Sequence, residues 1–271
     1  MDSAVKKLQL PAELEALLQG SRFQRDTLGC SSASIFRIDG PSGIASAYLK
    51  VQRSTEDDDL LREASMLAWL RGRLPVPEVL HFSQEGDTQY LLISAIPGQN
   101  AADSELLIES RAEATVRALA RGLRLIHALP VADCPFTRRL DVVLSEARQR
   151  VAQGLVDAAD LQPENQGRTA EDLLAQLLAL RPDREDLVFT HGDYCLPNII
   201  LQGGEVSGFI DWGRGGIADR YTDLGLVVRS LKYNLGLANG QQLLSAFWQE
   251  YGVEHVDGAK IDYFILLDEL F

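Results

Sequence analysis

The chain has 271 residues, 46% of them hydrophobic, and a formal net charge of -13. This length allows two lobes around a cleft, and the acidic balance argues against nucleic acid as a partner, since neutralising phosphates needs surfaces rich in Lys and Arg. An acidic chain suits a cationic ligand, although solubility alone also explains the charge.

No stretch approaches the roughly 18 apolar residues of a membrane span, and Met1–Leu10 lacks the apolar core of a signal peptide. The three cysteines, Cys30, Cys134 and Cys195, have no metal-ligand spacing and cannot all pair. We therefore expect a cytoplasmic protein in a reducing compartment.

The amino-terminal part begins with a short predicted helix, Pro11–Leu18. Strand patterns at Ser34–Ile38 and Ala45–Gln52 flank a Gly- and Pro-containing turn and predict a β-hairpin. Small residues at 28–33, Ser31 among them, offer N–H groups and hydroxyls that could close over phosphates, although such a stretch is more often a plain loop.

Lys50 is the only lysine between Lys7 and Lys232, in a chain with five lysines and 21 arginines. Alternation along the strand puts Tyr48 and Lys50 on one face. Lysine offers a compact charge for the α- and β-phosphates of a nucleotide, and Tyr48 offers a ring for the base. A solvated strand lysine is the alternative.

The predicted helix from Asp57 to Leu70 supplies a partner for Lys50. Glu63 is expected beside an apolar stripe made of Leu60, Leu61, Ala64, Leu67 and Ala68. A glutamate there can hold Lys50 as a helix glutamate holds a strand lysine in kinases, or it can form a solvent-facing pair with Arg62.

A lobe boundary is predicted near residue 95. The prolines of 74–80 favour extended chain, Tyr90–Ser94 is a strand pattern, and Pro97-Gly98 separates it from a long predicted helix. We expect a nucleotide-binding lobe at 1–95 and a larger, mostly helical lobe at 96–271. The predicted helices are Ser104–Ala128, Arg139–Gln153, Thr169–Leu180, Asp219–Asn234, Gly240–Tyr251 and Gly258–Phe271.

The second lobe also contains a polar constellation set in strand-like sequence. Leu187–Phe189, Ile199–Leu201 and Val206–Ile210 are strand patterns, and Gly203-Gly204 is suited to a two-residue hairpin turn. In this register Asn198 and Asp211 project from one end of the ribbon on the same face. A carboxylate and an amide oxygen suit a hard cation such as Mg²⁺, which takes further ligands from phosphates.

Asp193 lies five residues before Asn198, so it can orient an attacking hydroxyl beside that metal. H-x-D-x-x-x-x-N, followed by D-x-G at Asp211, is the spacing of a kinase catalytic loop and its metal motif. Asp and Asn also cap turns, so a purely structural role is the alternative for each of these residues. Arg214 and Arg229 could orient Asp193 or contact phosphate, or lie on the surface.

With these motifs in view, the chain resembles the aminoglycoside 3′-phosphotransferases, bacterial antibiotic kinases with a eukaryotic-protein-kinase-like fold. The resemblance covers almost the whole length and rests on Tyr48–Lys50, Leu74–Phe82, Asp133–Phe136, Thr190–Ile200, Gly208–Arg214, Ala218–Asp223 and Leu266–Phe271. It implies an α+β, two-lobed kinase-like fold with a small β-rich lobe carrying one main helix and a larger, mostly helical lobe carrying the catalytic hairpin.

The resemblance also implies the activity, which is transfer of the ATP γ-phosphate to the 3′-hydroxyl of kanamycin- or neomycin-type antibiotics. Asp193 would be catalytic, Asn198 and Asp211 would hold Mg²⁺, and the nucleotide side would comprise Ser31, Tyr48, Lys50, Glu63, Ser94 and Ile96. The cationic aminoglycoside would meet Asp157, Asp160, Glu164, Arg214, Arg229, Asp268, Glu269 and the Phe271 carboxylate. A bacterial, cytoplasmic monomer or weak dimer is expected.

One departure from the family pattern concerns Tyr233, which stands where an acidic residue is expected one turn after the substrate-side arginine. Two other functions stay open on the sequence. One is a kinase of choline, homoserine or a macrolide, which share the H-G-D-x-x-x-x-N motif. The other is a nucleotide-binding module without catalysis.

Overall fold

The computed structural model describes residues 9–26, 33–40, 46–54, 59–159 and 161–271. The chain forms two compact units, one extending to Pro97 and including Ser207–Gly213, the other comprising Gly98–Val206 and Arg214–Phe271. The segment Ser207–Gly213 thus groups with the first unit, whereas the predicted boundary assigns it to the second lobe. The functional division into 1–95 and 96–271 stays a prediction.

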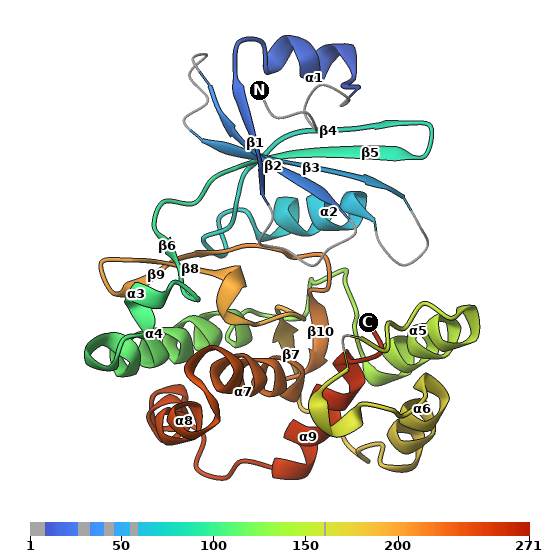
Figure 1. The fold of residues 1–271 in the computed structure, drawn as a ribbon, viewed down its shortest axis with the longest axis vertical. Coiled ribbons are helices and arrows are strands. Elements are labelled where there is room, and N and C mark those ends of the chain that lie inside the picture. The colour runs from blue at the N-terminus through green and yellow to red at the C-terminus, as the bar shows by residue number, and fades with distance from the viewer. Residues whose placement is uncertain (1–8, 27–32, 41–45, 55–58, 160) are drawn as a thin grey trace. The chain divides into compact units, whose positions relative to one another are not determined.

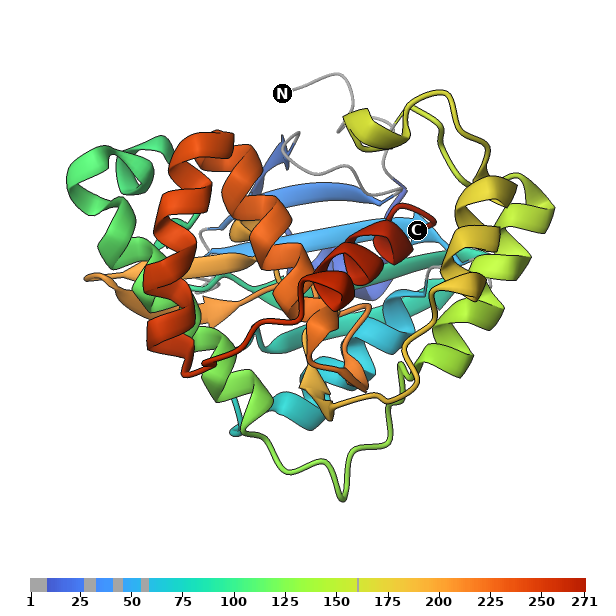
Figure 2. The same cartoon turned by 90° about the horizontal axis from the view of Figure 1, so that it is seen from below.

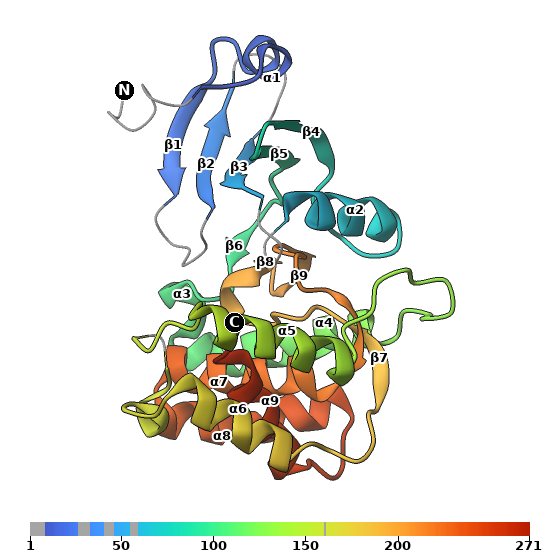
Figure 3. The same cartoon turned by 90° about the vertical axis from the view of Figure 1, so that its right-hand side faces the viewer.

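The first unit is built on a five-stranded antiparallel sheet in the order β1-β2-β3-β5-β4 (Figures 1 and 3). Its strands are β1 (Arg22–Asp26), β2 (Ser34–Asp39), β3 (Ala47–Arg53), β4 (Val79–Glu85) and β5 (Thr88–Ser94). The helix α1 (Ala12–Leu17) precedes the sheet, and α2 (Leu60–Leu70) packs against β4 and β5. The predicted hairpin is β2 and β3, which pair in register from Ser34↔Val51 to Ile38↔Ala47.

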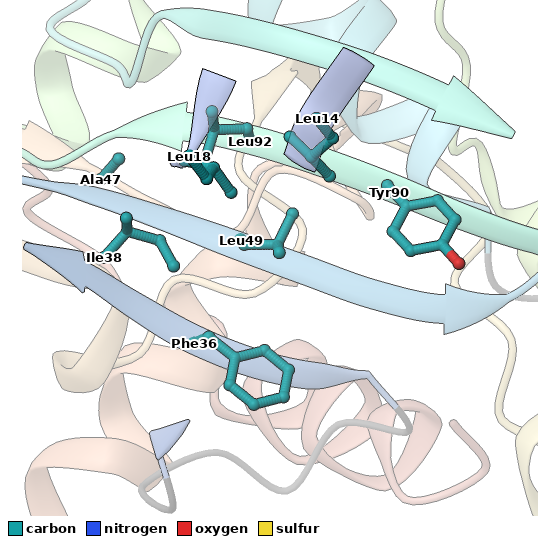
Figure 4. Packing of buried hydrophobic residues seen from close by; sticks show 8 residues of the cluster. All are labelled: Leu14, Leu18, Phe36, Ile38, Ala47, Leu49, Tyr90 and Leu92. Carbon is teal, nitrogen blue, oxygen red and sulfur yellow. The ribbon is translucent and has the colours of Figure 1, made fainter. Parts of the chain in front are cut away.

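One face of this sheet carries an apolar core shared with α1 (Figure 4). Its buried members are Leu14, Leu18, Phe36, Ile38, Ala47, Leu49, Tyr90 and Leu92. Because side chains alternate along β3, burying Ala47 and Leu49 here directs Tyr48 and Lys50 to the opposite face. The core therefore fixes the face on which the candidate phosphate-binding lysine lies.

The strand β1 was not predicted, because Arg-Phe-Gln-Arg-Asp holds only one apolar residue. Its Phe23 packs against the core, and the remaining side chains belong to an edge strand. The apolar stripe predicted for α2 is also wrong in part. Leu61 is 47% exposed and Ala68 is exposed, whereas Glu63 lies among the buried residues at 3%.

The second unit is mostly helical (Figure 2). Its helices are α3 (Ser104–Leu107), α4 (Glu109–His127), α5 (Leu140–Gln153), α6 (Ala170–Ala179), α7 (Tyr221–Leu235), α8 (Leu237–Tyr251) and α9 (Gly258–Asp268). Helix α7 packs against both α8 and α9, α4 packs against α8, and α5 lies beside α6. A capping box formed by Thr169 and Asp172 starts α6 at the predicted place.

The predicted helix Ser104–Ala128 is two helices, because Ile108 takes an extended conformation (φ -62°, ψ 150°) between α3 and α4. No proline or glycine marks this break. None of the helices in the described residues combines the length and the apolar content of a membrane span.

Short strands complete the second unit and lead back to the first. The predicted strand β7 (Leu187–Thr190) pairs antiparallel with β10 (Gly216–Asp219), which was not predicted. The two-residue β6 (Gln99–Asn100) pairs with β8 (Ile199–Gln202), and the chain then turns into β9 (Glu205–Phe209). Gly203 and Gly204 have φ of 61° and 86°, as the predicted hairpin turn requires.

Candidate active site

The first unit holds a charge cluster centred on the buried Lys50, which we call the phosphate-side cluster: Lys50, Glu63 and Asp211. The Lys50 Nζ lies 2.8 Å from both carboxylate oxygens of Glu63 and 3.1 Å from Asp211 Oδ1. Lys50 comes from β3, Glu63 from the first turn of α2, and Asp211 from the segment after β9. The predicted Lys50–Glu63 pair is thus present in the structure.

Two carboxylates around one ammonium keep that ammonium charged. Burial lowers the pKa of Lys50, but the negative charges of Asp211 and Glu63 outweigh burial, so its pKa is raised. The Glu63 side chain is only 4% exposed, and that of Asp211 is 47% exposed. Glu63 therefore serves to fix Lys50, whereas Asp211 remains accessible to a ligand.

Asp211 has φ of 66° and is the one non-glycine residue with positive φ among those the structure describes. The next residue, Trp212, is fully buried and its Nε1 donates to the Phe209 carbonyl. Asp tolerates this left-handed region better than most residues, but the conformation still needs support from its surroundings. The buried indole supplies part of that support.

The other residues predicted for the nucleotide side lie on the same unit. Tyr48 is half-buried on the Lys50 face of β3. Ser94 ends β5, where its N–H donates to the Glu78 carbonyl and its hydroxyl accepts from the Glu78 N–H. Ile96 is half-buried, and Ser31 lies outside the described residues.

The second unit presents Asp193 on a loop after β7. The Asn198 side-chain amide donates to the Asp193 carboxylate at 2.8 Å and to the Asp193 carbonyl at 3.0 Å. Asn198 is buried and ends a short 3-10 turn, Leu196–Asn198. One residue therefore holds the loop and the candidate catalytic carboxylate together.

Asp223 anchors this loop from α7, a role that the sequence did not reveal. Its carboxylate is fully buried and accepts hydrogen bonds from the N–H groups of His191 and Gly192, both at 2.8 Å. His127 Nε2 lies 3.0 Å from the same carboxylate, and His127 Nδ1 lies 2.7 Å from the Tyr251 hydroxyl. The available sequence signal was an aspartate directly before the apolar run of a predicted helix.

Gly192 is required at its position by both conformation and space. Its φ is 83°, and a Cβ there would lie 2.1 Å from the Arg214 carbonyl oxygen. No L side chain fits such a gap, because the obstacle is backbone. The glycine of the H-G-D motif thus lets the loop pass against the Arg214 backbone.

The predicted substrate residues near the end of the chain meet in what we call the C-terminal cluster: Arg214, Arg229, Asp268 and Glu269. Asp268 bridges Arg214 at 2.9 Å and Arg229 at 2.6 Å. Burial lowers the pKa of Arg229, but Asp268 and Asp193 raise it more, so the net direction is upward. Asp268 is therefore already neutralised by two guanidinium groups.

Glu269 is held by a different set of donors. Its carboxylate accepts from the Asn165 side-chain amide at 2.8 Å and from the Gln162 N–H at 2.9 Å. Arg168 in turn donates to the Asn165 carbonyl oxygen at 2.9 Å. The sequence predicted substrate ligands on the loop after α5, which contains Asn165, but did not identify Asn165 itself. A single amide in a polar loop forms no recognisable pattern.

Phe271 lies among three arginines, with its ring centre 5.6 to 5.9 Å from the guanidinium carbons of Arg138, Arg150 and Arg214. Arg150 also donates to the Leu270 carbonyl oxygen and to a main-chain carboxylate oxygen of Phe271. These contacts order the last residues described. Arg150 was not singled out from the sequence, where it is one of 21 arginines.

The acidic residues predicted on the loop after α5 differ in status. Asp157 is exposed, and one of its carboxylate oxygens accepts from the Ala159 N–H. Glu164 is exposed on the short turn Pro163–Asn165, whereas Asp160 lies outside the described residues. Tyr233, the departure from the family pattern, is 87% exposed on α7.

The two predicted metal ligands belong to different units, Asn198 to the second and Asp211 to the first. Their convergence on one cation therefore stays a prediction. Both offer hard oxygen donors, which fits Mg²⁺. Within the described ranges no three His, Cys, Asp or Glu side chains gather as a metal site.

Comparison with known proteins gives a consistent result. A model of the phosphotransferase enzyme family matches residues 22–263. An aminoglycoside 3′-phosphotransferase of Niallia circulans is 38% identical over 261 residues, covering 96% of this chain and 97% of that protein.

Two solved structures agree with this relationship. The crystal structure of aminoglycoside-3′-phosphotransferase of type VIII has a TM-score of 0.84 at 35% identity, covering 96% of this chain and 97% of that chain. Aminoglycoside phosphotransferase APH(3″)-Id from Streptomyces rimosus, in complex with ADP and streptomycin, has a TM-score of 0.81 at 30% identity, with 95% of each chain covered. These matches confirm the predicted α+β kinase-like fold, and the chain belongs to the aminoglycoside 3′-phosphotransferase group of the phosphotransferase enzyme family.

Proposed function

We propose that this protein transfers the γ-phosphate of ATP to the 3′-hydroxyl of kanamycin- or neomycin-type aminoglycosides and so confers resistance. The observation that carries the proposal is the Asp193 carboxylate, oriented by the Asn198 amide on a loop whose backbone is anchored by Asp223. In a phosphotransferase, a carboxylate fixed in this way suits the orientation of an attacking hydroxyl.

In the proposed reaction the sugar oxygen forms a bond to the γ-phosphorus while the bond from that phosphorus to the bridging oxygen of ADP breaks. Asp193 accepts a hydrogen bond from the sugar hydroxyl, orients it and receives its proton. Lys50, charged and held by Glu63, stabilises the α- and β-phosphates. Most of the acceleration is then positioning and charge stabilisation.

The base of the nucleotide would lie against Tyr48 and the segment from Ser94 to Ile96. The N–H groups of Ser94 and Ala95 already donate to Glu78 and Ser46, which directs a base toward Ile96. Ser31 stays a candidate for phosphate contact. The related structure solved with ADP supports nucleotide use by this family.

Asn198 and Asp211 would hold Mg²⁺. Once bound, the cation would neutralise charge on the transferring phosphates. Asp211 suits this role because its side chain is half-exposed.

On the substrate side, a polycation would meet a set of carboxylates, of which those of Asp157 and Glu164 are exposed. Asp157, Asp160, Glu164 and Glu269 are the proposed ligands of its ammonium groups, with the Phe271 carboxylate. Asp268 contributes less directly, because Arg214 and Arg229 share it. The two arginines would chiefly hold Asp268 and balance charge near Asp193.

A second candidate substrate is streptomycin, because the structure at 30% identity contains it. Purified protein with ATP and Mg²⁺ should phosphorylate kanamycin and not its 3′-deoxy analogue, and streptomycin should be inert. Equal turnover of kanamycin and the 3′-deoxy analogue would exclude 3′ transfer. Turnover of streptomycin alone would favour the second candidate, and turnover of choline, homoserine or a macrolide alone would reject both.

We place the enzyme in the bacterial cytoplasm, where ATP is available, as a monomer or weak dimer. The bacterial origin of the relative at 38% identity supports the source.

A further inference from the structure

The segment Asp211-Trp212-Gly213 is held to the rest of the first unit through each of its three residues. Asp211 Oδ1 accepts from Lys50, the main-chain N–H of Trp212 donates to the Glu63 carboxylate, and the Gly213 carbonyl accepts from Arg62 Nε at 2.9 Å. Arg62 and Glu63 are neighbours in the first turn of α2. The first turn of α2 thus contacts Trp212 and Gly213 through two consecutive side chains, and Lys50 of β3 contacts Asp211.

The hydrogen bond from Arg62 is made to Gly213, the residue of this segment whose backbone is least restricted by packing. Nothing lies within 4 Å of the position that a Gly213 Cβ would occupy, so packing does not fix this residue. Glycine also populates more backbone conformations than any other residue. Two residues earlier, Asp211 has the left-handed φ of 66°, which persists only when the surroundings determine it.

On the buried side of the segment, the Trp212 indole and Glu63 fix the backbone conformation. At Gly213, where no side chain packs, the hydrogen bond from Arg62 is the contact that fixes it. Arg62 is half-buried and its Nε points to a main-chain carbonyl, so the surface Arg62–Glu63 pair considered from the sequence is not what the structure contains. Glu63 is instead paired with Lys50.

We propose that Arg62 is a positioning residue that fixes the Asp211–Gly213 backbone and so presents the Asp211 carboxylate to the divalent cation of a bound nucleotide. The inference rests on the proposed role of Asp211 in holding Mg²⁺. Arg62 itself would touch neither the nucleotide nor the metal. Its effect passes through the Gly213 carbonyl.

The test compares the affinity for ADP in the presence of Mg²⁺ and in EDTA, measured by calorimetry on the full chain. Arg62→Met removes the donor and keeps the length of the side chain, and Arg62→Lys keeps the charge but loses the Nε donor. Arg53→Met is the matched control, because Arg53 lies in the same unit with a side chain that is 81% exposed. Circular dichroism melting checks that each variant is folded.

Both Arg62 variants should bind ADP like the wild type in EDTA and about tenfold more weakly with Mg²⁺, the loss of one hydrogen bond to a charged group. Arg53→Met should match the wild type in both conditions. If Arg62→Met does not fold, Arg62→Lys alone decides.

An equal loss with and without Mg²⁺, or no loss in either condition, would overturn the proposal. Wild-type behaviour of Arg62→Lys would also overturn it, because charge and not the Nε bond would then matter. No aminoglycoside enters this assay, so its failure is separate from failure of the 3′-transfer assay. A wild type whose ADP affinity ignores Mg²⁺ would reject the metal role of Asp211 and this inference with it.

Discussion

The phosphate-side cluster and the C-terminal cluster use the same kinds of charged group in opposite proportions. In the first, one lysine is shared by two carboxylates, and both members of the Lys50–Glu63 pair are at most 10% exposed. In the second, Asp268 is shared by two arginines whose side chains are 24% and 40% exposed. The buried Lys50–Glu63 pair fixes one charge in one place, whereas the partly exposed C-terminal cluster balances charges that a ligand can rearrange. We expect the first to tolerate substitution far less than the second.

The largest effect is expected at neither cluster. Asp193→Ala should lower kcat by about a thousandfold, because the group that orients and deprotonates the hydroxyl is lost. Steady-state kinetics with kanamycin measures this, and Asp141→Ala, an exposed aspartate paired with Arg181, is the control. Undiminished activity of Asp193→Ala would refute the catalytic role of Asp193.

Lys50→Met, in the phosphate-side cluster, should lower both the unfolding free energy and the turnover of the protein. Removing the ammonium leaves Glu63 buried without its partner, which should cost about 3 to 5 kcal/mol of unfolding free energy. The double variant Lys50→Met with Glu63→Leu should recover much of that free energy but not the activity. Urea unfolding and turnover, measured together, check both.

The C-terminal cluster offers the contrasting result: Asp268→Asn should cost less than about 1 kcal/mol in the same unfolding experiment, since its partners reach water. A loss as large as that of Lys50→Met would show that the two clusters do not differ as exposure suggests.

Asn165→Ala should alter binding more than chemistry. Glu269 keeps the Gln162 N–H but loses the Asn165 amide, so the KM for kanamycin should rise about five- to tenfold while kcat stays within about twofold. Gln153→Ala, an exposed amide at the end of α5, is the control. A lower kcat at unchanged KM would place Asn165 in the chemistry and contradict the role of Glu269 as a substrate ligand.

The smallest effect concerns α9, the helix that carries Asp268. Burial raises the pKa of Tyr263 to about 12, and its hydroxyl has no hydrogen-bond partner among the described residues. An unfolded tyrosine ionises near pH 10, so the folded state gains stability that is fully present below about pH 10 and is lost as the pH rises toward 12.

Unfolding free energies between pH 8 and 11.5 should therefore fall by up to about 2 kcal/mol, and by less in Tyr263→Phe. The Lys50–Glu63 pair should not contribute to this loss below pH 10. The pKa of Lys50 is raised in the folded state, so the stability that it adds is lost only at higher pH. An identical decline in both proteins would show that Tyr263 is not the group responsible.

Residues whose chemistry is rare in the chain could be predicted from the sequence. Lys50 stands out among few lysines, Asp193 and Asn198 form a spaced motif, and Gly203-Gly204 dictates a hairpin. The Lys50–Glu63 pair followed from a strand face and a helix position. Each of these signals is local.

The supporting residues were missed for physical reasons. Asp223, Arg150 and Arg62 act on main-chain groups that lie more than 30 residues away, and a main-chain donor or acceptor leaves no mark on residue type. Asn165 acts on the Glu269 carboxylate, 104 residues away, so no local pattern reveals it. The strands β1 and β10 were missed because they are short and carry few apolar residues. The burial of Glu63 depends on an ion pair that hydrophobic patterning does not register.

The grouping of Ser207–Gly213 with the first unit has a consequence for recombination between related genes. This segment packs there through Pro75, Pro97, Arg62 and Lys50, although more than a hundred residues of the second unit intervene. A chimera with a single crossover after Pro97 would place one parent's Asp211-Trp212-Gly213 against the other parent's sheet and α2. Exchange of the first unit as an intact module therefore needs three junctions, one near residue 97 and one on either side of 207–213.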